Sequence, residues 1–283
     1  MIEITTQKIY KGQKAETFSK KYIKNEFFKL EELIDNNEMH KFHLNKMPKY
    51  LCRYEDIIPY KQNTITISTP NKEINGSWIN IPCKRNIIVT QGPLEQCIDD
   101  FWSMCFDYNI NSIVMLCNEI EEGVKKCSKY WEIKNSKIYK VIKLEKKFEN
   151  EIFLQKNITI QNLFTNNNKT FFHIQFKKWP DHQIPDSATL KMFENLFEFI
   201  DNYRGDAPPV IHCSAGIGRS GVFIALYLLY KEIIRQISTQ NLISFNIFNL
   251  VRKLKESRIY MVENINQYQF IYNFIEDLLI EKN

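Results

Sequence analysis

One segment near the carboxyl end limits what this 283-residue chain can fold into. Residues Pro209–His212 are a short apolar run typical of a buried strand, and Arg219–Gln236 have the pattern of a strongly apolar helix. The loop between them is short and contains Gly216 and Gly218, which allow the backbone to turn tightly. A buried strand that leads through such a loop directly into a helix indicates an α/β domain.

The loop itself has the composition of a phosphate site with a nucleophile. Backbone N–H groups at a helix N-terminus bind phosphate, and Cys213 opens the loop, so the same dipoles would favour its thiolate. Arg219 has a planar guanidinium suited to two phosphate oxygens, and Ser220 can hydrogen-bond the sulfur as it leaves. Taken alone, Cys213 would be a buried core cysteine. The prediction depends on the strand, His212, the two glycines and the helix occurring together.

The sequence His212–Gly221 resembles the signature loop of the protein tyrosine phosphatase family. The resemblance extends from about Thr17 to the carboxyl end, because further motifs follow in the family order. It implies a single α/β domain with a central, highly twisted mixed β-sheet flanked by helices. The implied activity is hydrolysis of phosphotyrosine in proteins through a phosphocysteine intermediate. We therefore predict an N-terminal lead over residues 1–16 and a catalytic domain over residues 17–283.

Two further loops match the family pattern. Trp179–Pro185 resembles the mobile acid loop, in which Asp181 would give a proton to the leaving tyrosine oxygen. Cys52–Ile57 resembles the phosphotyrosine-recognition loop, whose Tyr54 would stack on the substrate ring and whose Asp56 would bind the substrate backbone. The depth of such a pocket would keep phosphoserine away from the sulfur. Without the resemblance, the aspartate is a turn residue and the tyrosine a surface residue.

The same resemblance implies residues that support the reacting groups. Glu121 would hold the loop arginine, Lys126 would lie near the acid-loop aspartate, and Tyr130 would hydrogen-bond the signature histidine. Read singly, Glu121 and Lys126 are a solvated charge pair that contributes little. Gln267 matches a glutamine that positions the attacking water. The predicted site comprises Cys213, Asp181, Arg219, Ser220 and Gln267 as catalytic residues, Tyr54, Asp56, Ser214, Ala215, Gly216, Ile217, Gly218 and Lys126 as substrate-binding residues, and His212, Glu121, Tyr130, Trp179 and Glu263 around them.

Two positions depart from the family pattern. Glu263 replaces the first glutamine of the water-positioning loop, within Met261–Tyr268, and a carboxylate there would face the phosphocysteine, which has the same sign of charge. Either Glu263 is protonated, or it points away, or the second step is slowed, and we predict the slower second step. Gln183 replaces a glycine, and it would strain the acid loop if that position requires a positive φ.

Two other functions remain open. A phosphotyrosine-binding protein without turnover could have the same fold, and Glu263 keeps that alternative open although the cysteine, aspartate and arginine are all present. A dual-specificity or phosphoinositide phosphatase shares the Cys-x5-Arg spacing. Tyr54 argues against that class, because such chains usually lack the recognition loop.

Charge, hydropathy and cysteine content predict the partners, the compartment and the cofactors of the protein. The net charge of +5 is mild and spread along the chain, so we expect no nucleic-acid partner. We find no signal peptide and no apolar run of membrane-spanning length, and we expect a cytoplasmic protein without a membrane span. The seven cysteines lack a CxxC pair, which favours free thiols over disulfides or zinc. We expect no metal or other cofactor, a monomer, and phosphotyrosine-containing proteins as partners.

Periodicity predicts the remaining elements. Further helices are expected at Thr17–Ile34, from the turn after Gln91 to Tyr108, and at Ala188–Tyr203, Phe245–Ser257 and Gln267–Ile280. Further strands are expected at Ile65–Ser68, Trp78–Ile81, Asn86–Thr90, Ser112–Leu116, Lys137–Phe148, Ile152–Phe164 and Thr170–Trp179. The first 15 residues have the pattern of a loose lead-in.

Overall fold

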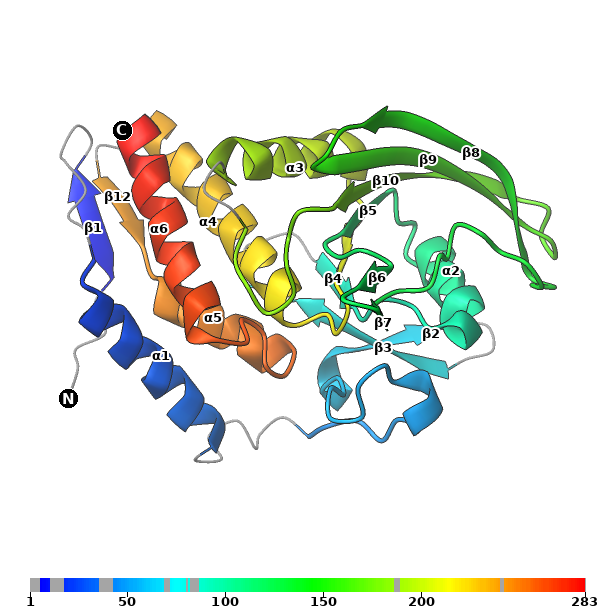
Figure 1. The fold of residues 1–283 in the computed structure, drawn as a ribbon, viewed down its shortest axis with the longest axis horizontal. Helices are drawn as coiled ribbons and strands as arrows, with labels where there is room; N and C mark the ends of the chain where they lie inside the picture. Colours follow the sequence, from blue (N-terminus) through cyan, green and yellow to red (C-terminus); the bar gives the residue numbers. More distant parts are fainter. Residues whose placement is uncertain are drawn as a thin grey trace.

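A mixed sheet of eight strands forms the centre of the fold (Figure 1). The computed structural model describes residues 6–10, 18–35, 43–68, 72–79, 81, 87–185, 189–239 and 242–282. In spatial order the strands are β2 (Thr64–Ile67), β3 (Lys72–Ile79), β4 (Ile87–Thr90), β11 (Val210–His212), β5 (Ser112–Met115), β10 (Asn168–Phe176), β9 (Phe153–Asn162) and β8 (Tyr139–Glu149). The four central strands β4, β11, β5 and β10 are parallel, and the outer strands pair antiparallel. The predicted mixed sheet is confirmed.

The strand sequences explain this order. Every residue of β4, β11 and β5 is buried, as expected for parallel strands that are covered on both faces. The edge strand β8 is mostly exposed and carries four lysines and two glutamates, which discourage pairing with another chain. The apolar centre and the charged edge therefore fix which strands lie inside.

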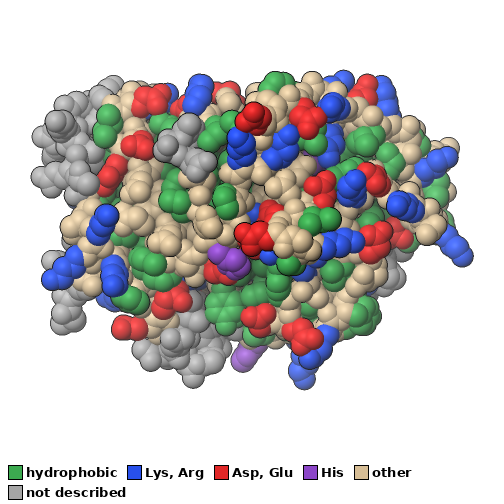
Figure 2. All heavy atoms as spheres, in the orientation of Figure 1, with side chains coloured by type: hydrophobic (Ala, Val, Ile, Leu, Met, Phe, Trp, Pro, Cys, Tyr) green, Lys and Arg blue, Asp and Glu red, His purple; other side chains and the backbone are tan. Residues whose placement is uncertain are grey.

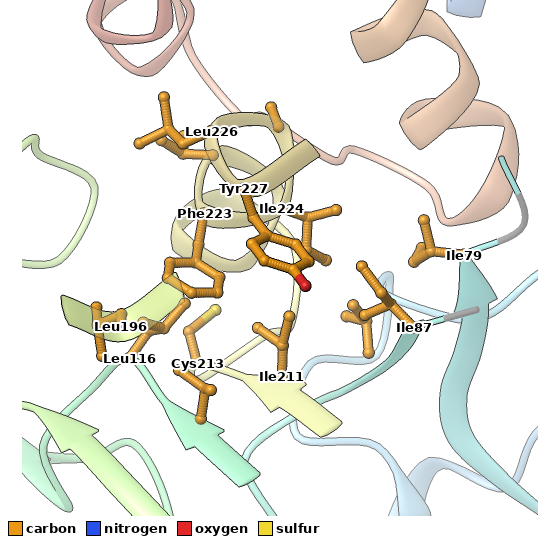
Figure 3. Packing of buried hydrophobic residues seen from close by; sticks show 14 of the residues in the cluster. Ile79, Ile87, Leu116, Leu196, Ile211, Cys213, Phe223, Ile224, Leu226 and Tyr227 are labelled. Atoms are coloured by element: carbon orange, nitrogen blue, oxygen red, sulfur yellow. The ribbon is translucent and has the colours of Figure 1, made fainter. Parts of the chain in front are cut away.

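Six helices pack around the sheet. They are α1 (Lys20–Asp35), α2 (Ile98–Asp107), α3 (Thr189–Arg204), α4 (Gly218–Thr239), α5 (Ile247–Ser257) and α6 (Ile265–Lys282) among the described residues. Figure 1 shows α4, α5 and α6 together on one side of the sheet and α2 on the other. Helix α4 is buried over its first twelve residues, Gly218–Leu229, which explains its apolar composition. In Figure 3, Phe223 of α4 lies over Ile211 and Cys213, so the strand–loop–helix unit is part of the core.

Two small antiparallel pairs complete the fold: β6 (Ile120–Glu121) with β7 (Val124–Lys125), and β1 (Gln7–Tyr10) with β12 (Leu242–Phe245). The expectation of a loose lead-in is therefore wrong for Gln7–Tyr10, which forms a strand by pairing with a distant segment of the chain. The predicted start of the helix at Phe245 is also wrong. Phe245 ends β12, and Asn246 then caps α5 by accepting the N–H of Asn249 at 2.7 Å. The predicted domain boundary between residues 16 and 17 lies outside the described residues.

Candidate active site

A cleft of about 200 Å³ lies beyond the carboxyl ends of the parallel strands, where open α/β sheets bind their ligands. Figure 1 places the loops after β10 and β11 near the middle of the view, and Figure 2 shows histidine, acidic and basic side chains close together there. The residues of the predicted site that line the cleft are Tyr54, Asp56, Lys126, Asp181, Cys213, Ser214, Ala215, Ile217, Gly218, Arg219, Glu263 and Gln267. The others do not line it: Gly216, Ser220, His212, Glu121, Tyr130 and Trp179. His182 and Ile57 also line the cleft, and sequence reasoning did not assign them to the site.

The nucleophile loop, Cys213–Arg219, is held in one conformation. Cys213 is 3% exposed, and its Sγ accepts the N–H of Gly216 at 3.3 Å. Gly216 has φ +73°, and a Cβ there would lie 2.3 Å from the carbonyl oxygen of Thr90. Only glycine therefore fits at this position.

The carbonyl groups of this loop are tied away from the cleft. The Ser214 carbonyl accepts the N–H of Gly92 at 2.8 Å, and the carbonyls of Ala215 and Gly216 each accept from Arg258 at 3.0 Å. In a planar trans peptide the N–H points opposite to the C=O. The N–H groups of residues 215–217 are therefore turned inward, next to the N-terminus of α4. This arrangement can hold a phosphate-sized anion.

Arg258 is a functional residue that sequence reasoning missed. It is fully buried, and besides the two loop carbonyls it donates to Asn75 Oδ1 at 2.8 Å and Ser77 Oγ at 3.2 Å. Burial lowers the pKa of Arg258 to about 10, while Cys213 acts in the opposite direction, so the guanidinium stays charged at neutral pH. Its charge favours an anion in the loop. An arginine that follows an amphipathic helix is normally exposed, so nothing in the sequence pattern pointed to this role.

Arg219 is held by the partner predicted for it. Its Nη1 and Nη2 donate to the two carboxylate oxygens of Glu121 at 2.7 and 3.0 Å, and Nη1 also donates to the Trp179 carbonyl at 2.9 Å. Nη2 donates to Asp181 Oδ1 at 3.0 Å. Burial alone would lower the pKa of Arg219, but the hydrogen bond to Glu121 raises it above its usual value. The guanidinium is therefore a fixed positive charge at the cleft.

Asp181 has two cationic neighbours, Arg219 and Lys126, and Lys126 donates to its Oδ2 as predicted. Burial would raise the pKa of Asp181, but the Lys126 hydrogen bond and the charges of Arg219 and His182 lower it below its usual value. The carboxylate is thus ionised at neutral pH. A phosphate dianion on Arg219 would displace Asp181 and add a negative charge beside it, and both changes favour its protonation.

A hydroxyl chain joins the recognition loop to the nucleophile loop. Ser214 Oγ lies 3.1 Å from the Lys126 carbonyl, to which it donates, and 2.9 Å from Tyr54 OH. Because serine has one hydrogen to give, Tyr54 donates in the second contact. These contacts fix Tyr54 at one wall of the cleft.

A second buried network lies behind Cys213. Tyr130 OH is 2.9 Å from His212 Nε2, the predicted contact, and 2.7 Å from Nε2 of His173, which sequence reasoning missed. His212 Nδ1 lies 3.1 Å from the Cys213 carbonyl. Burial lowers the pKa of His212 to about 4 and that of His173 well below its usual value, so both are neutral at pH 7. The tautomers then follow: His212 Nδ1–H donates to the carbonyl, Tyr130 donates to His212, and His173 donates to Tyr130.

Two predicted catalytic residues are buried with unpaired groups. Ser220 is fully buried on the first turn of α4, and its hydroxyl has no partner among the described residues. Gln267 is 1% exposed, and its Oε1 accepts the N–H of Glu263 at 2.8 Å. Its Nε2 has no partner in the described part of the chain, and it lies at the cleft. Gln267 therefore has a donor available for a bound water.

The two departures from the family pattern differ in outcome. Gln183 does not have a positive φ, so the predicted strain at that position is wrong. The left-handed residue of the acid loop is His182, at φ +53°. Glu263 lines the cleft, as its position in the sequence predicts, and its Oε2 lies 3.1 Å from His182 Nδ1.

The described residues also bear on the other sequence predictions. Six of the seven cysteines are described, and all six are free. Across those same ranges, no helix is long and apolar enough to cross a membrane. A group of three or more His, Cys, Asp or Glu side chains that could hold a metal ion is absent from the ranges that the structure covers.

Comparison with known proteins identifies the family. Residues 48–277, well over half of the chain, match the family model described as protein-tyrosine phosphatase. The chain belongs to the protein-tyrosine phosphatase family. The resemblance of the signature loop is therefore confirmed over most of the chain.

Individual relatives agree with this assignment. The chain is 33% identical over 262 residues to the rat tyrosine-protein phosphatase non-receptor type 20, covering 90% of this chain and 60% of that protein. It is 36% identical over 218 residues to tyrosine-protein phosphatase 2 of Dictyostelium discoideum, covering 75% of this chain and 56% of that protein. The crystal structure of the catalytic domain of human protein tyrosine phosphatase non-receptor type 18 superposes with a TM-score of 0.78 at 25% identity, covering 91% of this chain and 96% of that domain. The chain thus spans about 60% or less of the length of these two curated relatives.

Proposed function

We propose that this chain is a protein tyrosine phosphatase that hydrolyses phosphotyrosine in proteins through a phosphocysteine intermediate. One observation carries the proposal: a single cleft contains a buried cysteine under inward-facing N–H groups, an arginine held in a fixed orientation, and an aspartate. Family membership and the tyrosine-protein phosphatases among its relatives support it.

In the first step the phosphate of phosphotyrosine binds the loop N–H groups and Arg219. The Cys213 thiolate attacks phosphorus, the S–P bond forms, and the bond from phosphorus to the tyrosine oxygen breaks. Asp181, protonated once phosphate has taken its place on Arg219, gives its proton to that oxygen. The negative charge on the transferred group is met by the guanidinium and by fixed dipoles.

In the second step water attacks the phosphocysteine. Gln267 Nε2 donates to this water, and Asp181, now ionised, accepts its proton. The S–P bond breaks, inorganic phosphate leaves, and the thiolate of Cys213 is restored. The hydroxyl of Ser220 is the donor we assign to the departing sulfur, since it is buried next to Arg219 and has no other partner among the described residues.

Recognition of the substrate depends on the walls of the cleft. Tyr54 is fixed beside Ser214 and can stack on the tyrosine ring, and Asp56 lies at the same wall to bind the peptide backbone. A solved structure shows PTPN18, a protein with the same fold, in complex with HER2-pY1196 phosphor-peptides, which supports phosphotyrosine peptides as the partner class. Free thiols and the non-receptor relatives support a cytoplasmic role in signalling.

The test is phosphate release from a phosphotyrosine peptide. We expect vanadate-sensitive turnover in the wild type and a loss of about 10³-fold or more in Cys213→Ser, because the nucleophile is removed. Cys97→Ser is the matched control, since Cys97 is a partly buried cysteine outside the cleft, and it should keep full activity. Tight peptide binding without turnover would instead indicate a phosphotyrosine-binding protein. Equal rates on a phosphoserine peptide would indicate a dual-specificity phosphatase.

A further inference from the structure

The acid loop contacts the water-positioning loop through a histidine and a glutamate. His182 Nδ1 lies 3.1 Å from Glu263 Oε2, and His182 Nε2 lies 3.5 Å from Asp181 Oδ2. A carboxylate has no hydrogen to give at neutral pH, so His182 is the donor to Glu263. The imidazole therefore lies between the carboxylate of the acid loop and that of the opposite loop.

A second contact joins the same two loops through the backbone. Asn264 Nδ2 donates to the His182 carbonyl at 3.1 Å. The same Asn264 side chain caps α6 by accepting the N–H of Gln267 at 3.1 Å, and the Glu263 N–H donates to Gln267 Oε1 at 2.8 Å. Glu263 and Asn264 are thus fixed to the start of α6, and they hold His182 at two points.

The conformation of His182 needs such contacts. Its φ of +53° lies in the left-handed region, which residues other than glycine seldom adopt. Its side chain is 68% exposed, so packing alone does not hold it. A strained residue persists where the surrounding contacts outweigh the strain.

We propose that Glu263 and Asn264 form a latch that holds the acid loop over Cys213 and so positions Asp181 for proton transfer. The role in proton transfer depends on the proposed function, whereas the latch itself does not. Glu263 then acts as a positioning residue, and its carboxylate is hydrogen-bonded to His182. The side-chain ends of Glu263 and Gln267 both lie against Gly218, where a Cβ would be 2.8 Å from each. The Gln267 Nε2 has no partner among the described residues and remains a donor for the water.

The latch can be tested by alkylation of Cys213 with the neutral reagent iodoacetamide, corrected for the rate measured in Cys213→Ser. A loosened acid loop uncovers the thiol. We expect Glu263→Ala and His182→Ala each to raise the rate by about two- to fivefold, the effect of an exposed hydrogen-bonded pair. The double variant should be no faster than the faster single variant, because both substitutions break one contact. Glu263→Gln keeps an acceptor oxygen and should lie between Glu263→Ala and the wild type.

The control is Glu151→Ala, which removes an exposed carboxylate from an ion pair with Lys178, beside the acid loop and outside the cleft. It should leave the alkylation rate unchanged. Glu263→Ala removes a carboxylate and His182→Ala an imidazole, so an electrostatic effect of the carboxylate on the thiol would appear in Glu263→Ala and not in His182→Ala. A shift in Glu263→Ala alone, additive shifts or unchanged rates would each overturn the latch.

Turnover provides a second readout that separates this inference from the proposed function. Misplacement of Asp181 should lower kcat on a phosphotyrosine peptide by a similar factor while KM changes less. If the wild type shows no turnover, the proposed function fails and alkylation still decides the latch. If the wild type turns over but Glu263→Ala and His182→Ala alter neither alkylation nor kcat, the latch fails and the function stands.

Discussion

The nucleophile loop and the acid loop of this protein face the same cleft but are held in different ways. Cys213 and its neighbours lie in the core, with their carbonyls bound to a buried arginine and the cysteine backbone bound to a chain of neutral histidines. The acid loop is anchored to the core at Trp179, which is buried and whose carbonyl accepts from Arg219, but its tip is held by side chains at the rim, where His182 is 68% exposed. Phosphate binding and the nucleophile are thus built into the folded core. Proton transfer depends on a few contacts that can break and form again with little change in the free energy of unfolding.

The largest effect expected from this comparison is kinetic. Asp181→Asn removes the proton donor and acceptor, so kcat on a phosphotyrosine peptide should fall by about 10²- to 10⁴-fold. The melting temperature should stay close to that of the wild type, because this carboxylate lies at the cleft, 22% exposed, and is not packed in the core. Stopped assays of phosphate release and a thermal melt measure the two quantities.

Asp206→Asn is the control for this substitution, since Asp206 is an exposed aspartate in the turn before β11 and outside the cleft. It should change neither quantity. A variant Asp181→Asn that loses several degrees of melting temperature would contradict the comparison, because it would show that the acid loop supports the core.

The same contrast explains which features could be predicted from the sequence. The parallel strands and α4 are long or fully buried apolar segments, so their patterns located them correctly. Strand β1 is four residues long and is stabilised by pairing with β12, a contact that no local pattern reveals. Strand β3 begins at Lys72, six residues before the predicted start at Trp78, because its first half has few apolar residues.

The residues of the site divide in the same way, into those that lie in local motifs and those that only the fold brings together. Cys213 and Arg219 lie in one contiguous motif whose residue types carry the chemistry, and the resemblance of the acid loop to the family pattern added Asp181, so these three residues could be predicted to meet. Arg258 and His173 support Cys213 from segments far from it in the chain, and only the folded structure brings them there. The His182–Glu263 contact likewise joins residues 81 positions apart.

The next largest expected effect tests how the core holds the nucleophile loop. Arg258→Met keeps a long side chain but leaves the carbonyls of Ala215 and Gly216 buried without their donor. Lost hydrogen bonds to a charged group, with acceptors left unpaired, should lower the free energy of unfolding by about 3 kcal/mol. Iodoacetamide should also alkylate Cys213 at a changed rate, since the loop that holds its Sγ loses two of its contacts. Urea unfolding and the alkylation rate check both effects.

Arg252→Met is the matched control, because Arg252 lies on α5, the helix that Arg258 follows, and is 41% exposed in a pair with Glu256. Its effect on unfolding should stay within about 0.5 kcal/mol. If Arg258→Met were as stable as this control, the buried arginine would not be holding the loop, and the contrast between the two loops would fail.

The smallest expected effect is a pH dependence of stability. It distinguishes the buried histidines behind Cys213 from the acid loop. The pKa of His212 is about 4 in the folded protein, against an ordinary 6.5, because burial disfavours its charged form. Between these values the unfolded chain binds a proton that the folded protein does not, so stability is complete above pH 6.5 and decreases as the pH falls toward 4. From pH 6.5 to pH 5 this amounts to about 2 kcal/mol for His212, at about 1.4 kcal/mol per pH unit. Burial of His173 acts in the same direction. The pKa of Asp181 lies below its ordinary 3.8, so the acid loop contributes only at lower pH.

Urea unfolding at pH 7 and pH 5 measures this difference. His173→Gln removes one buried titrating group, so the loss of stability between the two pH values should be smaller than in the wild type, whatever the change in absolute stability. His43→Gln, a substitution at an exposed histidine, should leave the difference unchanged. Equal unfolding free energies at pH 7 and pH 5 in the wild type would mean that the histidines behind Cys213 can take up protons in the folded state. The histidines behind Cys213 would then be as accessible to protons from the solvent as the residues of the acid loop.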